Sequence, residues 1–167
     1  MPCGILIAED ELIERMVLKK TLVKQYGDCC EIYAAANGKE ALEIFRKQFV
    51  QIAILDIEMP GIKGIDVAEI IRQESESCCI IFLTAYDRFE YAKRAIRLRA
   101  MEYLLKPYSE KELLSVVEEA LRWGDKTARA ENFPDPPELQ TEVPEEYFLA
   151  EEQSRLSVMV SMVEEYL

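Results

Sequence analysis

The sequence contains no histidine, and this absence excludes several kinds of catalytic site. Histidine general bases, Ser-His-Asp triads and histidine metal ligands cannot be built from this chain. Long apolar runs are also missing, because none approaches the roughly 20 residues of a membrane-spanning helix. The start of the chain, residues 1–4, lacks the charged region of a signal peptide. We therefore expect a cytoplasmic protein without membrane association, whose chemistry uses carboxylates, hydroxyls and lysine.

Thiol motifs and positive charge are scarce as well. The five cysteines include no C-x-x-C spacing: Cys3 stands alone, and the others form the pairs Cys29-Cys30 and Cys78-Cys79. We interpret them as reduced, small apolar residues, with redox sensing as the alternative. A net charge of -12 disfavours direct contact with nucleic acid or anionic membranes. DNA would be reached only through another domain.

Short apolar runs alternate with helical spacing from about residue 4 to residue 121. The predicted strands lie at 4–8, 31–36, 51–56, 79–84 and 102–105. The predicted helices lie at 11–26, 38–48, 64–74, 88–98 and 109–121. Strands that are apolar almost throughout, each followed by a helix, are typical of a parallel sheet covered on both faces. The predicted fold is α/β, a doubly wound five-stranded parallel sheet of flavodoxin-like type with strand order 2-1-3-4-5.

Two helices carry informative details. In the first predicted helix, the apolar residues Leu12, Met16 and Val23 alternate with the charged pair Lys19-Lys20, which indicates an apolar and a charged face. Ser109 followed by Glu112 fits a capping box at the start of the last helix.

The composition changes beyond Trp123. Residues 122–167 hold four basic and eleven acidic residues, a net charge of -7, and four of the seven prolines. We predict a folded domain at 1–123 and an acidic, proline-containing linker at 124–150. An amphipathic helix at 151–167 would follow and could begin a further effector domain.

Four apolar runs end on polar residues of different kinds, namely Glu9-Asp10, Asp56, Thr84 and Lys106. The carboxyl ends of parallel strands meet at one edge of a sheet, so these side chains should converge there. Three neighbouring carboxylates repel one another and call for a cation, and hard oxygen ligands suit Mg²⁺. The chemistry predicted is that of a carboxylate that accepts a phosphoryl group beside a divalent cation.

These motifs resemble the receiver domain of two-component response regulators over about residues 3–121. The matching motifs are Ala8-Glu9-Asp10-Glu11, Asp56 with Met59-Pro60-Gly61, Gly64, Thr84-Ala85 and Lys106-Pro107. The resemblance implies that Asp56 is the phosphoacceptor. It also implies a Mg²⁺ site formed by Asp10, Asp56, the backbone carbonyl of Glu58 and, mostly through water, Glu9.

The resemblance further implies how the signal leaves the site. Thr84 and Lys106 would hold the phosphoryl oxygens, and Tyr103 would be the aromatic switch residue. A sensor histidine kinase would be the donor, and the chain would be a phosphoacceptor rather than an enzyme, with at most slow self-dephosphorylation. The altered surface around the fourth helix, fifth strand and fifth helix would support a phosphorylation-dependent homodimer. A basic fourth helix and an acidic fifth helix could pair across its twofold axis.

Residues 84–92 and 103–107 are especially similar to regulators with a downstream AraC-type DNA-binding domain, which implies a transcriptional output. A stand-alone or enzyme-coupled receiver is the alternative. A phosphatase of the haloacid dehalogenase type is a further rival, but it needs an aspartate where Glu58 stands. Arg99 also departs from the family, which usually has glycine before the alanine there, and predicts a less tight turn.

Overall fold

The computed structural model describes residues 3–130, with side chains as far as residue 124, and all ten predicted elements are present in it. The strands are β1 (Cys3–Ala8), β2 (Cys30–Ala35), β3 (Ile52–Asp56), β4 (Cys79–Thr84) and β5 (Glu102–Leu105). The helices are α1 (Leu12–Tyr26), α2 (Gly38–Lys47), α3 (Gly64–Glu74), α4 (Phe89–Arg97) and α5 (Glu110–Ala130). All predicted bounds except the end of the last helix therefore agree with the structure to within one residue.

The last helix is longer than predicted. α5 continues to Ala130, so the predicted domain boundary at residue 123 falls inside a helix. Residues 122–130 contain one glycine and no proline, and a single helical glycine costs only about 1 kcal/mol. Composition alone was therefore a poor guide to the helix end. The rest of the predicted linker and the predicted helix at 151–167 lie outside the described residues.

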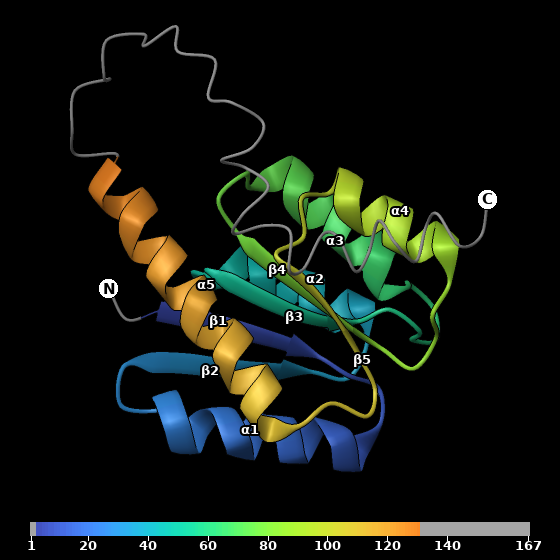
Figure 1. The fold of residues 1–167 in the computed structure, drawn as a ribbon, viewed down its shortest axis with the longest axis horizontal. Coiled ribbons are helices and arrows are strands. Elements are labelled where there is room, and N and C mark those ends of the chain that lie inside the picture. Colours follow the sequence, from blue (N-terminus) through green and yellow to red (C-terminus); the bar gives the residue numbers. More distant parts are fainter. Residues whose placement is uncertain (1–2, 131–167) are drawn as a thin grey trace, which may run out of the picture.

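The five strands form one parallel sheet in the order β2-β1-β3-β4-β5, as predicted. All strand arrows point the same way in Figure 1, so every strand ends at one edge of the sheet. We call this the carboxyl edge and the opposite one the amino edge. The fold is flavodoxin-like, and the carboxyl edge is where such sheets bind ligands.

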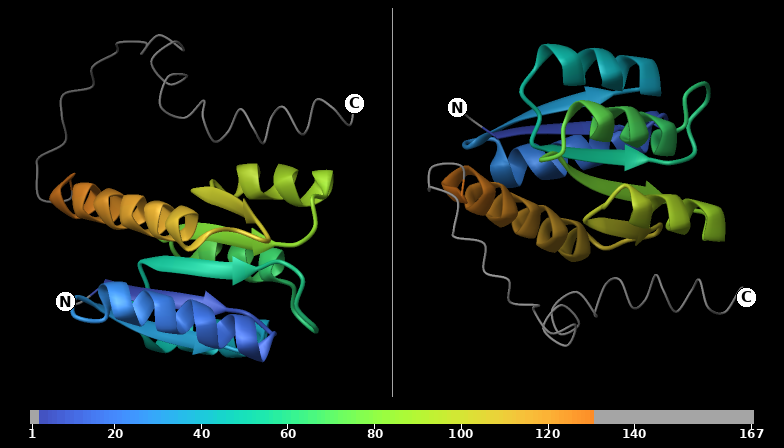
Figure 2. Two further views of the ribbon diagram at one scale, coloured as in Figure 1. Left: turned by 60° about the horizontal axis from the view of Figure 1, so that its bottom comes forward. Right: turned by 90° about the horizontal axis from the view of Figure 1, so that it is seen from above.

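Helices cover both faces of the sheet (Figure 2). Alternate residues of β1 enter two separate apolar clusters: Ile5 and Ile7 pack with residues of α1 and α5, whereas Leu6 packs with residues of α2, α3 and α4. All three β1 side chains are fully buried. Burial on both faces explains why the strands are apolar almost throughout.

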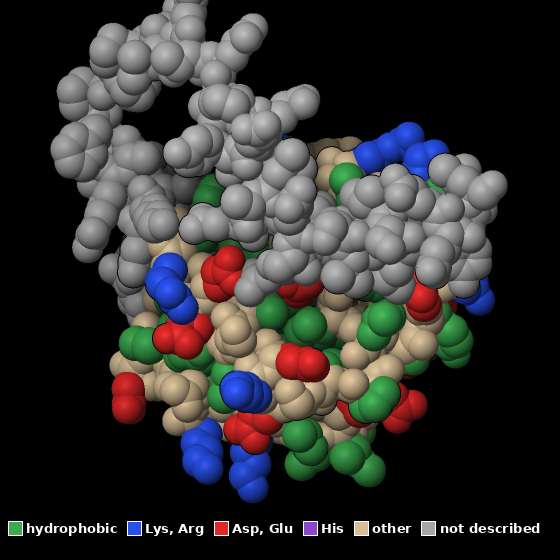
Figure 3. Space-filling model, viewed as in Figure 1, with side chains coloured by type: hydrophobic (Ala, Val, Ile, Leu, Met, Phe, Trp, Pro, Cys, Tyr) green, Lys and Arg blue, Asp and Glu red, His purple; other side chains and the backbone are tan. Residues whose placement is uncertain are grey.

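The apolar residues of α1 that the sequence pattern emphasises do not face the core. Leu12, Met16 and Val23 are 59%, 61% and 46% exposed, and the helix is anchored instead by Leu18 and Leu22. Hydrophobic side chains are accordingly visible at the surface over α1 in Figure 3. Apolar residues surround most of this helix, so their spacing could not decide which of them would meet the sheet.

The expected loosening of the turn after α4 is also wrong. Arg99 takes a positive φ of 55°. Its N–H bonds the Ile96 carbonyl, and the Ala100 N–H bonds the Ala95 carbonyl, both at 3.0 Å. This pattern is the Schellman motif that glycine usually completes. Arg99 therefore makes the tight turn in a conformation that is costly for a residue with a side chain.

Several smaller predictions are confirmed or tested. Ser109 and Glu112 form the predicted capping box, with both reciprocal bonds at 3.1 Å. All five cysteines are free, and burial raises the pKa of Cys78 to about 12 and that of Cys79 to about 11. These two thiols therefore remain protonated near neutral pH. Within the described residues, no helix is long and apolar enough to cross a bilayer.

Candidate functional site

The carboxyl edge gathers the buried polar residues of the described chain. These are Glu9, Asp56 and Thr84, which are 1%, 5% and 0% exposed. Each follows or ends an apolar strand, so the parallel topology brings together residues that are far apart in sequence. Burying two carboxylates costs free energy unless a cation or hydrogen bonds compensate.

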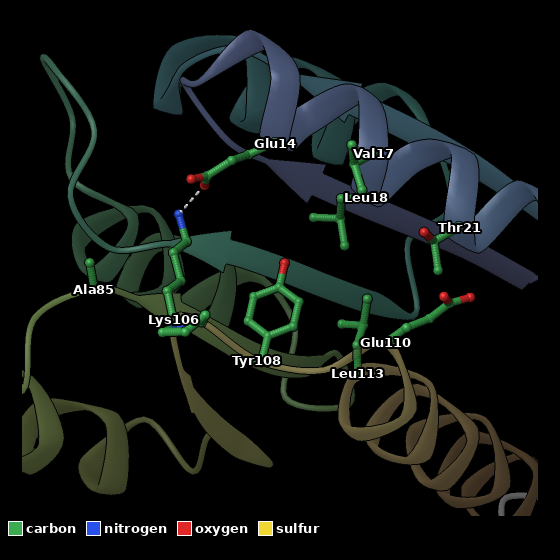
Figure 4. Close-up of a pocket in the computed structure, with 10 residues that line it drawn as sticks. Glu14, Val17, Leu18, Thr21, Ala85, Lys106, Tyr108, Glu110 and Leu113 are labelled. Atoms are coloured by element: carbon green, nitrogen blue, oxygen red, sulfur yellow. Dashed lines mark hydrogen bonds and ion pairs between the residues drawn. The ribbon is translucent and has the colours of Figure 1, made fainter.

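Lys106 supplies that compensation. It follows β5 and its Nζ donates to Glu9 Oε2 at 2.8 Å, Asp56 Oδ2 at 2.9 Å and Glu14 Oε2 at 2.6 Å. The Lys106 side chain is 16% exposed, and its peptide bond to Pro107 is cis. Figure 4 shows Lys106 reaching from the β5 side to Glu14 on α1. The ammonium group thus lies between three carboxylates from three different segments.

The pKa values of the cluster follow from burial and from these contacts. Burial raises the pKa of Glu9 from 4.5 to about 7; the Lys106 bond lowers it, and the Asp56 charge adds to the increase. For Lys106, burial alone would lower the pKa, but the bonds to Glu14, Glu9 and Asp56 outweigh it and hold the pKa above its ordinary value. Lysine therefore remains charged, while Glu9 titrates near neutral pH.

Asp56 is held in a fixed orientation. Its Oδ1 accepts the Glu58 N–H at 3.1 Å, while Oδ2 accepts Lys106. Gly64 approaches so closely that an added Cβ would lie 1.9 Å from the Asp56 carbonyl oxygen, so no other residue fits there without a shift. Both oxygens of this strand-end carboxylate are therefore hydrogen-bonded, which fixes the direction in which the group points.

Thr84 and Tyr103 meet at one backbone carbonyl. The Thr84 hydroxyl accepts the Tyr86 N–H at 3.1 Å and donates to the Tyr86 carbonyl at 3.3 Å. The Tyr103 hydroxyl donates to the same carbonyl at 3.1 Å. Its ring is buried edge-on to Phe82, and burial raises the pKa of the phenol. The two predicted switch residues are therefore connected through the segment that follows β4.

The donor set suits a hard divalent cation. Carboxylate oxygens of Glu9, Glu14 and Asp56 lie within 4.8 Å of one another, and Glu58 follows Asp56 by two residues. Oxygen donors of this kind are what Mg²⁺ prefers. The Asp10 carboxylate does not belong to this group of three.

Sequence reasoning missed two contributors on α1, Glu14 and Arg15. Arg15 Nη1 donates to the backbone carbonyls of Glu9 and Asp10 at 2.9 and 3.3 Å, and so fixes the β1–α1 turn. Glu14 adds the third carboxylate at Lys106. The sequence contained one indication of this role: Glu14 is an acidic residue in the first turn of the helix that follows β1.

A pocket of about 550 Å³ adjoins the site between α1 and the start of α5. Figure 4 shows Tyr108 pointing into the space below Glu14 and Leu18, with Lys106 at one end. Exposed apolar residues of α1 continue the surface, with Ile13 74% and Val17 59% exposed. The site is therefore approached from the side of α1 and α5.

Residues 5–118 match the family model of the response regulator receiver domain, and the chain belongs to this family. Receiver domains are the phosphoacceptor signalling domains of two-component systems. The haloacid dehalogenase alternative is not favoured by this match.

Named relatives agree with the family. The sensory transduction protein LytT of Oceanobacillus iheyensis is 42% identical over 112 residues, covering 66% of this chain and 44% of LytT. The uncharacterized transcriptional regulatory protein YesN of Bacillus subtilis is 33% identical over 117 residues, covering 70% of this chain and 32% of YesN. The chain therefore spans less than half the length of these curated relatives.

Solved structures support the fold. A response regulator receiver domain from Clostridium thermocellum is 26% identical with a TM-score of 0.68, covering 75% of this chain and 98% of that one. The chemotaxis protein CheY4 of Vibrio cholerae has a TM-score of 0.65 at 24% identity, covering 72% and 99%. The latter likeness concerns the fold alone.

Proposed function

We propose that this chain is a response regulator that receives a phosphoryl group on Asp56 from a phosphohistidine of a sensor histidine kinase in the cytoplasm. The supporting observation is a buried carboxylate at a strand end, hydrogen-bonded on one oxygen by Glu58 and on the other by Lys106. An Asp56 oxygen attacks phosphorus, and the phosphorus–nitrogen bond of the donor breaks with its electron pair leaving on the imidazole. The chain is a phosphoacceptor that at most loses the group slowly, and not an enzyme with a released product.

Lys106 and Thr84 then contact the transferred group. Phosphorylation brings new negative charge to Asp56, and Lys106 can exchange Glu9 and Glu14 for phosphoryl oxygens. Glu9, Asp10, Asp56 and the Glu58 carbonyl are the proposed Mg²⁺ ligands, with Glu14 close enough to take part. Mg²⁺, when bound, offsets negative charge on the phosphoryl oxygens.

The kinase is proposed to dock on α1 beside the pocket. The first turns of α1 carry exposed apolar residues beside the pocket that Lys106 helps to line. These residues offer a partner helix an apolar contact. They are Leu12, Ile13, Met16 and Val17.

The output is proposed to run through Thr84 and Tyr103 to α4, β5 and α5. When Thr84 bonds a phosphoryl oxygen, it gives up Tyr86, whose carbonyl also holds Tyr103. A homodimer on this face would join basic α4 to acidic α5, but Arg94 is already paired with Asp66 at 2.7 Å and Glu69 at 2.8 Å. Lys93 and Arg97 therefore carry more of the proposed contact than Arg94.

The regulated activity is proposed to be transcription, through a DNA-binding domain of AraC type downstream. Relatives named as transcriptional regulators support this output over a stand-alone or enzyme-coupled receiver.

Incubation with acetyl phosphate and Mg²⁺ tests the acceptor. We expect intact mass spectrometry to show one added phosphoryl group, which Asp56→Asn and EDTA both abolish. Asp28→Asn, which changes an exposed acid at the amino edge, serves as the control and should be phosphorylated normally. Full uptake by Asp56→Asn would disprove the assignment.

A further inference from the structure

Tyr91 connects the loop between β3 and α3 with α4 through contacts that the proposed function does not use. It belongs to the motif Phe89-Glu90-Tyr91-Ala92 at the start of α4 and is 6% exposed. The ring is part of the apolar cluster beneath α2, α3 and α4. Because the ring is packed, its hydroxyl has a fixed position at the carboxyl edge.

The hydroxyl joins the two ends of the loop between β3 and α3. It donates to Glu58 Oε1, near the start of that loop. It accepts from Lys63 Nζ at 3.1 Å, at the residue that precedes α3. The bonds run in one direction, from ammonium to phenol to carboxylate, so each polarises the next.

Two cations support the same ring. Lys63 Nζ lies 5.6 Å from the Tyr91 ring centroid, and Arg88 Cζ lies 5.8 Å from it. The Arg88 distance is typical of a cation–π contact, whereas Lys63 lies at the hydroxyl end of the ring that it bonds. The position of Tyr91 therefore depends on several contacts. Movement of either end of the β3–α3 loop would displace Tyr91 and with it the first turn of α4.

Glu58 has two separate contacts. Its backbone N–H bonds Asp56 Oδ1 at 3.1 Å, while its side chain accepts a hydrogen bond from Tyr91 on α4. The orientation of the Glu58 peptide, whose carbonyl is a proposed Mg²⁺ ligand, is thus coupled to α4. Thr84 and Tyr103 take no part in this connection.

We propose that Tyr91 is a positioning residue that holds the β3–α3 loop in its cation-binding conformation and couples Mg²⁺ binding to the first turn of α4. This inference rests on the proposed function, since it assumes that Mg²⁺ binds beside Asp56. Coupling between sites is reciprocal: if α4 contacts favour Mg²⁺ binding, then Mg²⁺ must stabilise those contacts equally.

Tyr91→Phe in the full chain tests the proposal, because it removes the hydroxyl and keeps the ring. Isothermal titration calorimetry should show Mg²⁺ affinity lowered about three- to tenfold, the effect expected for the loss of one typical hydrogen bond. Hydrogen exchange should show that Mg²⁺ slows exchange in the first turn of α4 in the wild type but not in Tyr91→Phe.

Matched variants separate positioning from general stability. Tyr26→Phe removes a hydroxyl that bonds the Leu114 carbonyl at 3.3 Å on the other face of the sheet, and should leave Mg²⁺ affinity unchanged. Glu58→Ala removes the acceptor of the Tyr91 hydroxyl and should lower Mg²⁺ affinity about as much as Tyr91→Phe. The double variant Tyr91→Phe with Glu58→Ala should be no weaker than either single one.

Two results would overturn the proposal, and they differ in meaning. If the wild type binds Mg²⁺ and accepts a phosphoryl group, but Tyr91→Phe has the same Mg²⁺ affinity and the same exchange response, the coupling through Tyr91 is wrong and the proposed function stands. If the wild type neither binds Mg²⁺ nor accepts a phosphoryl group, both proposals fail together.

Discussion

Lys106 and Arg72 are half-buried cations at opposite edges of the sheet, and their surroundings differ. At the carboxyl edge, Lys106 is bonded by three carboxylates, which keep its pKa above the ordinary value against the effect of burial. At the amino edge, Arg72 is bonded only by backbone carbonyls, and burial lowers its pKa. Those carbonyls belong to Ser75, Glu76, Cys78, Leu98 and Arg99.

The difference indicates that Lys106 can change its hydrogen-bond partners, whereas Arg72 has a structural role. In the proposed function, Lys106 exchanges one anion for another at little cost, because a phosphoryl group would replace the carboxylates that it leaves. Arg72 uses all three guanidinium nitrogens to bond backbone carbonyls of the chain before β4 and of the turn before β5. Its role is to hold two strands in register at the edge away from the chemistry.

The largest expected effect is at Arg72. Arg72→Met leaves several carbonyls without a donor and should lower the free energy of unfolding by about 3 kcal/mol, measured by urea denaturation. Arg72→Lys, which keeps the charge but not the planar set of donors, should recover less than half of this loss. Under conditions in which both variants are folded, acetyl phosphate should phosphorylate them as it does the wild type. Slower phosphorylation of the folded Arg72 variants would show that the two edges of the sheet are not independent.

A smaller effect is expected from the titration of Glu9. Its pKa is raised from 4.5 to about 7 in the folded protein, so its contribution to stability is full below pH 4.5 and is lost as the pH rises through about 7. Between pH 5 and pH 8, without Mg²⁺, the wild type should lose on the order of 2 kcal/mol relative to Glu9→Gln. Urea denaturation at a series of pH values measures this difference.

Mg²⁺ provides the control for Glu9. A cation beside Glu9 favours the ionised carboxylate, so saturating Mg²⁺ should reduce the pH dependence of the wild type but not that of Glu9→Gln. The loss caused by Arg72→Met should meanwhile stay constant over the same pH range. Equal pH dependence of the unfolding free energy in the wild type and Glu9→Gln would mean that the pKa of Glu9 is not raised in the folded protein.

The smallest effect is expected at Arg99, in the turn that Arg72 holds. Arg99→Gly should stabilise the protein by about 0.5–1 kcal/mol, because glycine tolerates a φ of 55° and this gain exceeds its entropy cost. The carbonyl bonded by Arg72 remains in place. Arg99→Ala should give no such gain, and thermal denaturation distinguishes the two. A destabilised Arg99→Gly would show that the arginine side chain contributes to the turn.

The sequence by itself determined the elements and the composition of the edge. Runs such as residues 52–56 and 79–84 are apolar with a polar last residue, and this local pattern fixed both the strand and the place of Asp56 and Thr84 at its end. Parallel topology then required Glu9 and Lys106 to lie at the same edge, as they do. The Mg²⁺ ligands and switch roles remain predictions.

Only the tertiary structure decided which residues meet across elements. The buried face of α1, the third carboxylate on Lys106 from Glu14, and the bond from Tyr91 to Glu58 all join segments distant in sequence. Apolar spacing and charge type act over one or two turns of chain, so they establish a helix but not its rotation against a sheet. Contacts between side chains depend on that rotation, and therefore on the packing of the whole domain.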